Sequence, residues 1–269
     1  MEKTFFKYKE SATVNTKLKH IVTTCLTSLD DFLMRLLDNK PYTLGIISEK
    51  IISQSGDLED FGITIVNDLQ TLNQFPELLK MSINKALSLV NFNKYKQYSI
   101  DEQIDVDVWD LLRTYCYFEY NYASSLLAIM SADEAKKYIE NQEVDKIQEQ
   151  RNPENYFKTF EDLIKNLKTI IDNFQTQEAI AEVLDDDRMV FKITKCKWAE
   201  MLKDFDPEFG FAMLCSTDYE LAKNYNPDFV LTRNNTLMEG DDYCDFCYHD
   251  TRTEKEITHP TDQFWKEYS

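Results

Sequence analysis

Apolar side chains recur at three- and four-residue spacing along most of the first 176 residues, which is typical of helices that bury one face. Pro41 and Pro76 mark a helix end and a helix start, because proline lacks an N–H and fits only the first turn. The form Ser131-Ala132-Asp133-Glu134 is that of a capping box, so we expect a polar helix from there to about Gln148. The other apolar stripes run from Leu18 to Leu37, from Leu79 to Val90, from Leu111 to Ile129 and from Tyr156 to Phe174.

The pattern changes after Gln177. Val190–Thr194 alternates between apolar and polar residues, as a half-buried strand does. Phe229–Leu237 and Tyr243–Asp250 are two further extended runs, and Gly240 between them can adopt the positive φ of a tight turn. We predict a β-hairpin, with Val190–Thr194 as the third strand of a small antiparallel sheet.

Short helices are predicted between these strands. Trp198–Phe205 returns to helical spacing, and Asp206-Pro207 has the form of an N-cap followed by proline, which opens a helix through Cys215. Thr217-Asp218-Tyr219-Glu220 has the form of another capping box, and its helix should end before Asn226.

These elements predict an α+β fold in one domain over residues 1–269. The expected parts are a mostly helical part over 1–176, an α+β part with the small antiparallel sheet and short helices over 177–250, and a polar tail over 251–269.

Composition narrows the functional classes. With five glycines and no phosphate-binding glycine motif, a P-loop or Rossmann enzyme is not expected. The net charge of −18 opposes binding to nucleic acid and to anionic membranes. The sequence after Met1 has no apolar leader, and no stretch is long enough to span a bilayer. We therefore expect a cytoplasmic protein whose six cysteines are reduced.

Cys244-Asp245-Phe246-Cys247 has the spacing of a zinc or redox motif, but it lies in a predicted strand. Side chains alternate along a strand, so the two thiols point to opposite faces and cannot chelate one ion together. Cys244, Phe246 and Tyr248 should share a core-facing side, with Asp245, Cys247 and His249 on a more exposed one.

Several residues are candidates for chemistry, each with an ordinary structural alternative. Cys244 is a nucleophile if Arg233 on the paired strand lowers its pKa, and otherwise a small buried hydrophobe. His249 is the best placed histidine for acid–base work, although a solvated strand end explains it equally. Asp218, beside Cys215, is explained by its place in a first helical turn. Glu119 interrupts an apolar aromatic stripe, either as a buried functional carboxylate or as a residue reaching water at the stripe edge.

The C-terminal motifs resemble the L-2-amino-thiazoline-4-carboxylic acid hydrolase family over about residues 198–250. The matching pieces, in chain order, are Cys215-Ser216-Thr217-Asp218-Tyr219, Arg233-Asn234-Asn235-Thr236-Leu237, Gly240 and Cys244-Asp245-Phe246. The family usually has an arginine after the last piece, where this chain has Cys247.

The resemblance implies a hydrolase that opens a cyclic amidine-like C–N bond in a small carboxylate. Our hypothesis makes Cys244 the nucleophile, Asp218 or Asp245 the acid–base group and Arg233 the carboxylate anchor, with Cys215, His249 and Glu119 as further site candidates. No cofactor is predicted, and a divalent metal that activates water is the competing mechanism. The alternative function is a non-catalytic binding or sensor protein that uses the same site for a small carboxylate. The sequence does not indicate an oligomeric state.

Overall fold

The computed structural model describes residues 3–65, 68–184, 188–202, 205–254 and 256–269. Their contacts divide into two compact units, which are described separately. The sheet unit contains Met1–Glu10 and Lys136–Ser269, and the helical unit contains Ser11–Ala135. This boundary lies well before residue 176, where the sequence pattern changes. The α+β class is confirmed, whereas the prediction of a single domain stays a prediction.

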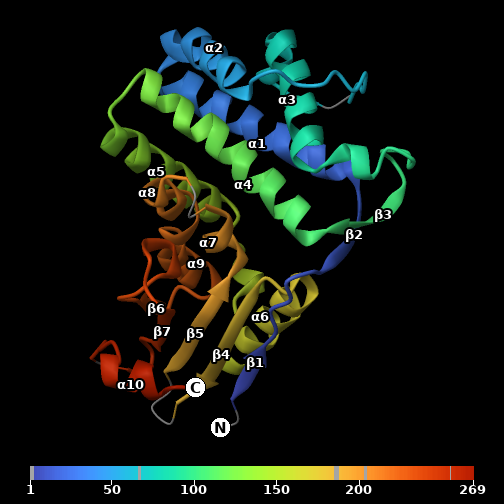
Figure 1. The fold of residues 1–269 in the computed structure, drawn as a ribbon. Coiled ribbons are helices and arrows are strands. Elements are labelled where there is room, and N and C mark those ends of the chain that lie inside the picture. Colours follow the sequence, from blue (N-terminus) through green and yellow to red (C-terminus); the bar gives the residue numbers. More distant parts are fainter. Residues whose placement is uncertain (1–2, 66–67, 185–187, 203–204, 255) are drawn as a thin grey trace. The chain divides into compact units, whose positions relative to one another are not determined.

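The helical unit packs long helices around an apolar centre and carries a two-stranded antiparallel sheet (Figure 1). Strands β2 and β3 each lead directly into a long helix, α1 and α4 respectively. The stripes predicted for three helices of this unit are confirmed, whereas α2 and both strands were not foreseen. The elements are β2 (Thr13–Lys17), α1 (Leu18–Asn39), α2 (Leu44–Ser55), α3 (Pro76–Leu89), β3 (Gln103–Asp107) and α4 (Val108–Ser125), with 3-10 turns at Pro41–Thr43, Leu72–Gln74, Phe92–Lys94 and Leu126–Ala128.

The sheet unit is built on five antiparallel strands in the order β1-β4-β5-β7-β6. The strands are β1 (Thr4–Phe6), β4 (Gln177–Val183), β5 (Met189–Cys196), β6 (Phe229–Thr232) and β7 (Cys244–Asp250). The predicted antiparallel pairing is confirmed for β6, β7 and β5, but the strand expected over Phe229–Leu237 ends at Thr232, and a longer connection with a 3-10 turn at Leu237–Glu239 replaces the tight turn. Gly240 has the expected positive φ, 97°, at the end of that 3-10 turn. Strands β1 and β4 extend the sheet beyond the predicted three.

Helices precede, interrupt and follow this sheet (Figure 1). The capping box of Ser131 and Glu134 is confirmed at the start of α5. The one predicted at Thr217 is wrong, because the Thr217 hydroxyl donates to the carbonyl of Leu214 and the Glu220 carboxylate binds Arg151. The helices are α5 (Ala132–Glu149), α6 (Phe160–Phe174), α7 (Lys197–Leu202), α8 (Pro207–Gly210), a π-helical turn (Phe211–Cys215), α9 (Asp218–Tyr225) and α10 (Asp262–Glu267), with 3-10 turns at Pro153–Asn155 and Leu237–Glu239.

Both faces of the sheet are covered. One face packs against α6 and α9, and its core includes Phe191, Phe246 and Tyr248. The other face packs against the C-terminal segment, where Trp265 is fully buried. The buried ammonium of Lys192 donates to the carbonyls of Trp265 and Tyr268 at the end of α10. The segment predicted to be a polar tail is therefore part of the packed structure.

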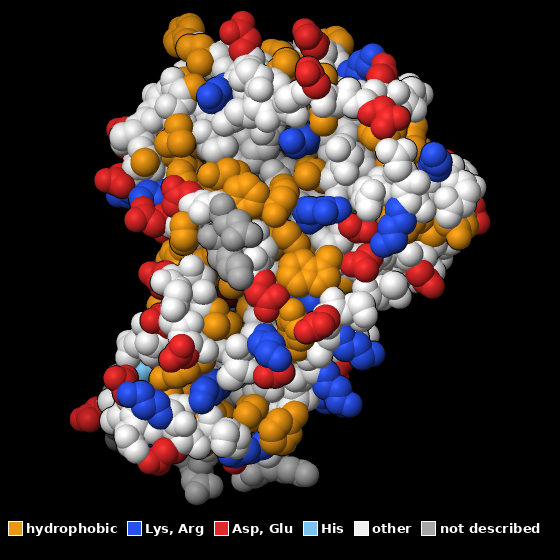
Figure 2. Space-filling view, in the orientation of Figure 1, with side chains coloured by type: hydrophobic (Ala, Val, Ile, Leu, Met, Phe, Trp, Pro, Cys, Tyr) orange, Lys and Arg blue, Asp and Glu red, His pale blue; other side chains and the backbone are white. Residues whose placement is uncertain are grey.

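Two expectations from the sequence concern the negative charge and the lack of a membrane-spanning stretch. Acidic side chains are scattered among basic ones over the face shown in Figure 2, so the negative charge there is spread rather than gathered at one point. None of the helices that the structure describes is both long and apolar enough to cross a bilayer.

Candidate functional site

Arg233 follows β6 and lies on the face of the sheet that α9 covers. Its side chain is 2% exposed, and its Nη1 donates to Asp218 Oδ2 at 2.5 Å while its Nη2 donates to the carbonyl of Cys215 at 3.0 Å. The guanidinium carbon lies 5.2 to 5.4 Å from the ring centres of Phe211, Tyr219 and Phe246, within reach of cation–π attraction. The cation is therefore held by Asp218, by the Cys215 carbonyl and by three aromatic rings.

Asp218 opens α9, and its side chain keeps a quarter of its surface exposed. Burial raises the pKa of this carboxyl to about 6, although Arg233 pulls it down by charge and by hydrogen bonding. A carboxyl that titrates near neutral pH can both accept and return a proton there. Asp218 is thus the group of this site best matched to acid–base work.

Three thiols interact electrostatically with this ion pair, those of Cys215, Cys244 and Cys196. Cys244 is 7% exposed, and its Sγ accepts a hydrogen bond from the N–H of Leu237 at 3.2 Å. Burial raises the pKa of Cys244 to about 12, and it also raises the pKa of Cys215 far above its usual value. Arg233 lowers both pKa values, but burial has the larger effect, so the depressed pKa that the sequence argument required of Cys244 is not found. At neutral pH these groups are thiols rather than thiolates.

These residues form what we call the Arg233 cluster, which consists of Arg233, Asp218, Cys215, Cys244 and Cys196. The first four were candidates from sequence, and the structure brings them together. Cys196 was missed, because at the end of β5 it belongs to no motif; its thiol interacts electrostatically with Asp218. The π-helical turn that ends at Cys215 is also unforeseen, and such turns are frequent at functional sites.

Asp245 and His249 lie on the opposite face of β7, as strand alternation predicted. The expectation that this face is more exposed is wrong, because both side chains are 0% exposed beneath the C-terminal segment. Asp245 Oδ1 accepts the backbone N–H groups of Asn234 and Asn235, and its Oδ2 accepts from the Asn235 side chain. Asp245 therefore fixes the loop directly after Arg233, while the sheet separates its carboxylate from the Arg233 cluster.

A chain of hydrogen bonds runs through this second face, and we call it the histidine chain. Glu254 Oε2 lies 2.7 Å from His249 Nδ1, and His249 Nε2 lies 2.8 Å from Thr232 Oγ1. The Thr232 hydroxyl also lies 2.9 Å from His259 Nδ1, and His259 Nε2 lies 3.1 Å from Asp245 Oδ2. Trp265 Nε1 is 3.0 Å from that same Nε2. Two imidazoles, each beside a carboxylate, thus meet at one hydroxyl.

The histidine chain predicts a loss of stability in mild acid. Burial lowers the pKa of His249, although Glu254 opposes this. Unfolded His249 therefore takes up a proton below about pH 6.5 where the folded residue resists, so the free energy of unfolding should fall as pH drops, by up to about 1.4 kcal/mol per pH unit. Urea denaturation at pH 7, 6 and 5 measures this. His249→Gln should flatten the dependence, and exposed His20→Gln should leave it unchanged. An equal pH dependence in His249→Gln would contradict the prediction.

Glu119 lies in the helical unit on α4, half-buried, and accepts a hydrogen bond from Tyr122 Oη at 3.0 Å. Its predicted role in substrate binding stays a prediction. Within the described ranges, no three or more His, Cys, Asp or Glu side chains are grouped so that they could hold a metal ion. Cys244 and Cys247 point to opposite faces of β7, as predicted from the strand.

Comparison with known proteins bears on the same region. The family model described as L-2-amino-thiazoline-4-carboxylic acid hydrolase matches residues 121–248. Neither the curated proteins nor the solved structures give a significant match. The matched segment contains the whole Arg233 cluster and ends one residue before His249. Over residues 121–248, this chain is similar to the L-2-amino-thiazoline-4-carboxylic acid hydrolase family.

Proposed function

We propose that the Arg233 cluster is the active site of a small-molecule hydrolase that opens a cyclic amidine-like C–N bond in a thiazoline carboxylate. The observation that carries the proposal is the ion pair of buried Arg233 with half-buried Asp218, inside the segment that matches the family. Arg233 supplies a cation for the substrate carboxylate. Asp218 supplies a carboxyl that titrates near neutral pH.

In the proposed reaction Asp218 takes a proton from a water molecule as the water oxygen bonds to the amidine carbon. The same carboxyl then gives the proton to the ring nitrogen. When the C–N bond breaks, the nitrogen keeps the electron pair and takes the hydroxyl proton as the carbonyl forms. A substrate carboxylate that shares the guanidinium weakens its hold on Asp218, and the pKa of Asp218 rises further. Asp218 then becomes a stronger base when substrate is bound. Cys244 as nucleophile remains the second route, which requires loss of the thiol proton during attack.

Asp218→Asn tests the assignment. With L-2-amino-thiazoline-4-carboxylate as substrate and ring opening followed by mass spectrometry, we expect kcat/KM to fall by about 100-fold or more. In the unaltered protein, activity should rise through about pH 6 as the Asp218 carboxylate forms. This limb of the pH profile should vanish in Asp218→Asn.

Two further variants separate the alternatives. Asp228→Asn removes an exposed carboxylate of the same unit and should leave kcat/KM unchanged. Normal turnover in Cys244→Ser would favour attack by water. Loss of turnover in this variant would favour attack by the thiol. Full activity of Asp218→Asn at every pH would overturn the acid–base role.

A second candidate function is a binding protein that holds a small carboxylate at Arg233 without turning it over. The burial of Cys244 within the sheet core favours it, because a sealed thiol is a poor nucleophile. Calorimetry with the thiazoline carboxylate distinguishes the two functions. Saturable binding without ring opening, lost in Arg233→Met, would establish the binding protein.

A further inference from the structure

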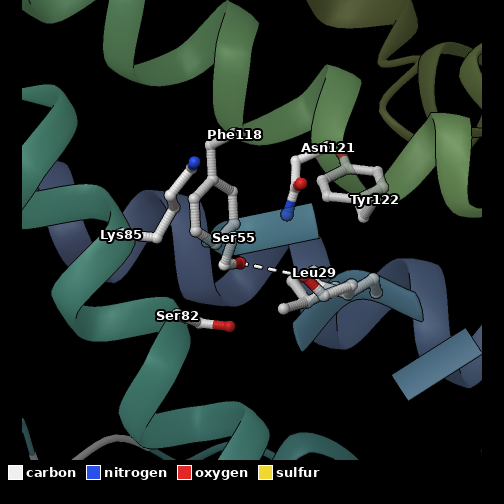
Figure 3. A pocket seen from close by; sticks show the side chains of 8 residues that line it. Leu29, Ser55, Ser82, Lys85, Phe118, Asn121 and Tyr122 are labelled. Atoms are coloured by element: carbon white, nitrogen blue, oxygen red, sulfur yellow. Dashed lines mark hydrogen bonds between the residues drawn. The ribbon is translucent and has the colours of Figure 1, made fainter. Parts of the chain in front are cut away.

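The loop after β6, which begins with Arg233, is held largely by side chains. In a helix the backbone binds itself and a side chain only adds to it, as Ser55 of α2 does when its hydroxyl donates to the carbonyl of Ile51 (Figure 3). Strand β6 ends at Thr232, and the backbone N–H groups of residues 234–237 all donate to side chains. Their acceptors, in chain order, are Asp245 Oδ1 at 2.9 and 2.7 Å, Asp241 Oδ2 at 2.7 Å and Cys244 Sγ at 3.2 Å. The path of this loop therefore depends on those side chains.

Asp245 binds the backbone of the two residues that follow Arg233. Its side chain is 0% exposed, and its Oδ2 accepts from the Asn235 side chain at 2.5 Å and lies 3.1 Å from His259 Nε2. Burial raises the pKa of Asp245, but the donors of His259, Asn235 and Asn234 together bring it below its usual value. The carboxylate is thus charged and bound through both oxygens, and charge-assisted hydrogen bonds of this kind are the strong ones.

His259 lies in the C-terminal segment and reaches the chain on both sides of Arg233. Its Nδ1 is 2.9 Å from the hydroxyl of Thr232, the residue before Arg233, and its Nε2 contacts Asp245, which holds the residues after. The imidazole is stacked on Trp265, with ring centres 5.6 Å apart and ring planes at 23°, and its side chain is 11% exposed. His259 therefore fixes Thr232 and Asp245 relative to each other. It lies beyond residues 121–248, so the family match does not account for it.

We propose that Asp245 and His259 are positioning residues, which hold the Arg233 guanidinium in place for a substrate carboxylate. The inference rests on the proposed function of the Arg233 cluster. Both side chains lie on the face of the sheet opposite to the guanidinium, so they act through the backbone of residues 232–235. A hydrogen bond from a guanidinium weakens steeply when its angle changes. The substrate carboxylate takes no part in bond breaking, so a displaced guanidinium should weaken binding of the ground state and the transition state alike.

His259→Phe in the full chain tests this role, because phenylalanine keeps a ring on Trp265 and loses both nitrogen contacts. With L-2-amino-thiazoline-4-carboxylate as substrate, we expect KM to rise about tenfold and kcat to change by less than about threefold. Asp245→Ala should raise KM at least as much, and Asp245→Asn less, because asparagine keeps an oxygen for the two backbone N–H groups. Asp250→Asn removes a carboxylate of the same strand that binds Arg252 instead, and it should leave KM unchanged.

The titration of Asp218, followed by carbon NMR of its carboxyl group, tests the same inference without substrate. Burial raises the pKa of Asp218 to about 6 against the pull of Arg233. A displaced guanidinium pulls less, so this pKa should rise by about 1 in His259→Phe and in Asp245→Ala. A loss of stability alone would not move it. The other titratable groups near Asp218 are unaltered in these variants; they are Cys196, Cys215, Cys244, Tyr225 and Tyr248.

A folded His259→Phe variant that keeps the KM or the Asp218 titration of the unaltered protein would overturn the positioning role. The proposed hydrolase fails on a different result, which is an unaltered protein that does not open the ring. In that case the Asp218 titration still decides whether His259 and Asp245 position Arg233, because it needs no turnover.

Discussion

Replacing Arg233 with methionine is expected to lower the free energy of unfolding of the sheet unit by about 3–5 kcal/mol. The guanidinium is 2% exposed and supplies two of the hydrogen bonds that fix Asp218 and the turn at Cys215. Without it, Asp218 would keep a charge among apolar and thiol groups with no cation beside it. The pKa of Asp218 would then rise above its present value of about 6. Urea denaturation followed by circular dichroism measures the loss.

A second substitution shows whether the uncompensated charge causes this loss. Arg233→Met combined with Asp218→Asn removes both charges. The double variant should therefore lose clearly less free energy of unfolding than Arg233→Met alone. Equal losses in the single and double variants would mean that packing against Phe211, Tyr219 and Phe246 dominates, and would contradict the electrostatic account.

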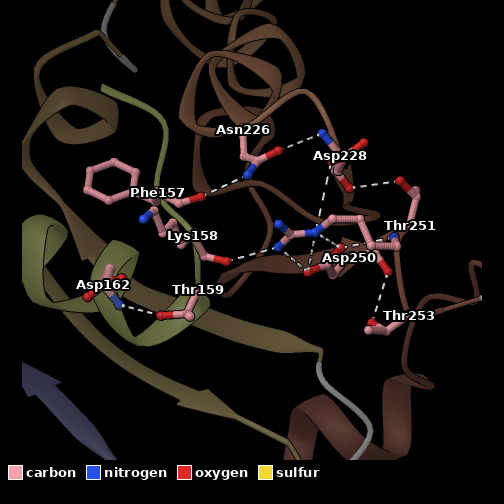
Figure 4. Close-up of polar contacts among 10 residues, drawn as sticks. Phe157, Lys158, Thr159, Asp162, Asn226, Asp228, Asp250, Thr251 and Thr253 are labelled. Atoms are coloured by element: carbon pink, nitrogen blue, oxygen red, sulfur yellow. Dashed lines mark hydrogen bonds and ion pairs between the residues drawn. The ribbon is translucent and has the colours of Figure 1, made fainter. Parts of the chain in front are cut away.

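Arg252→Met is the matched control. Arg252 also binds a carboxylate through two nitrogens, since its Nε and Nη2 contact Asp250, and it reaches the carbonyl of Lys158 (Figure 4). Its side chain is 42% exposed, so water screens the pair and we expect a loss of only about 1 kcal/mol or less. If Arg252→Met and Arg233→Met cost the same, burial is not what makes Arg233 important.

Helices were predictable from this sequence because their signals are local. The stripe from Leu18 to Leu37 and the proline at Pro76 each report on neighbouring residues, and α1 and α3 follow them. Strand β1 could not be found in the same way. Its three residues pair with Ala179–Ala181, so its conformation depends on a partner more than 170 residues later in the chain. Strands β2 and β3 were missed for the same reason, because each depends on pairing with the other across a long stretch of sequence.

The site was predictable to the extent that strand alternation and motif order are local too. Alternation along β7 correctly separated Cys244 from Asp245 and His249. Their exposure could not be inferred, because it depends on the segment that carries Trp265. The direction of the Cys244 pKa also depends on packing. The sequence identified the nearby cation, Arg233, but not the burial that outweighs it.

Replacing Trp265 with alanine is expected to cost the sheet unit about 3–5 kcal/mol, the usual penalty for removing a large buried aromatic side chain. Trp265 is fully buried against Val190 and Cys247, and its Nε1 reaches His259. Its loss would also loosen α10, whose last carbonyls accept from the buried ammonium of Lys192. Hydrogen exchange of the β5 and β7 amides, with urea denaturation followed by circular dichroism, measures the effect.

Phe264→Ala provides the comparison, because Phe264 packs edge-on against Trp265 but is only partly buried. It should cost clearly less than Trp265→Ala. Proteolysis should likewise cut the segment after Asp250 faster in Trp265→Ala than in Phe264→Ala, since only the first removes the side chain that anchors it. If Trp265→Ala instead unfolds at the same urea concentration as the unaltered protein, the C-terminal segment does not cover the histidine chain. His249 and Asp245 would then be as accessible as a strand edge in water, and the acid sensitivity expected from a buried His249 would disappear with them.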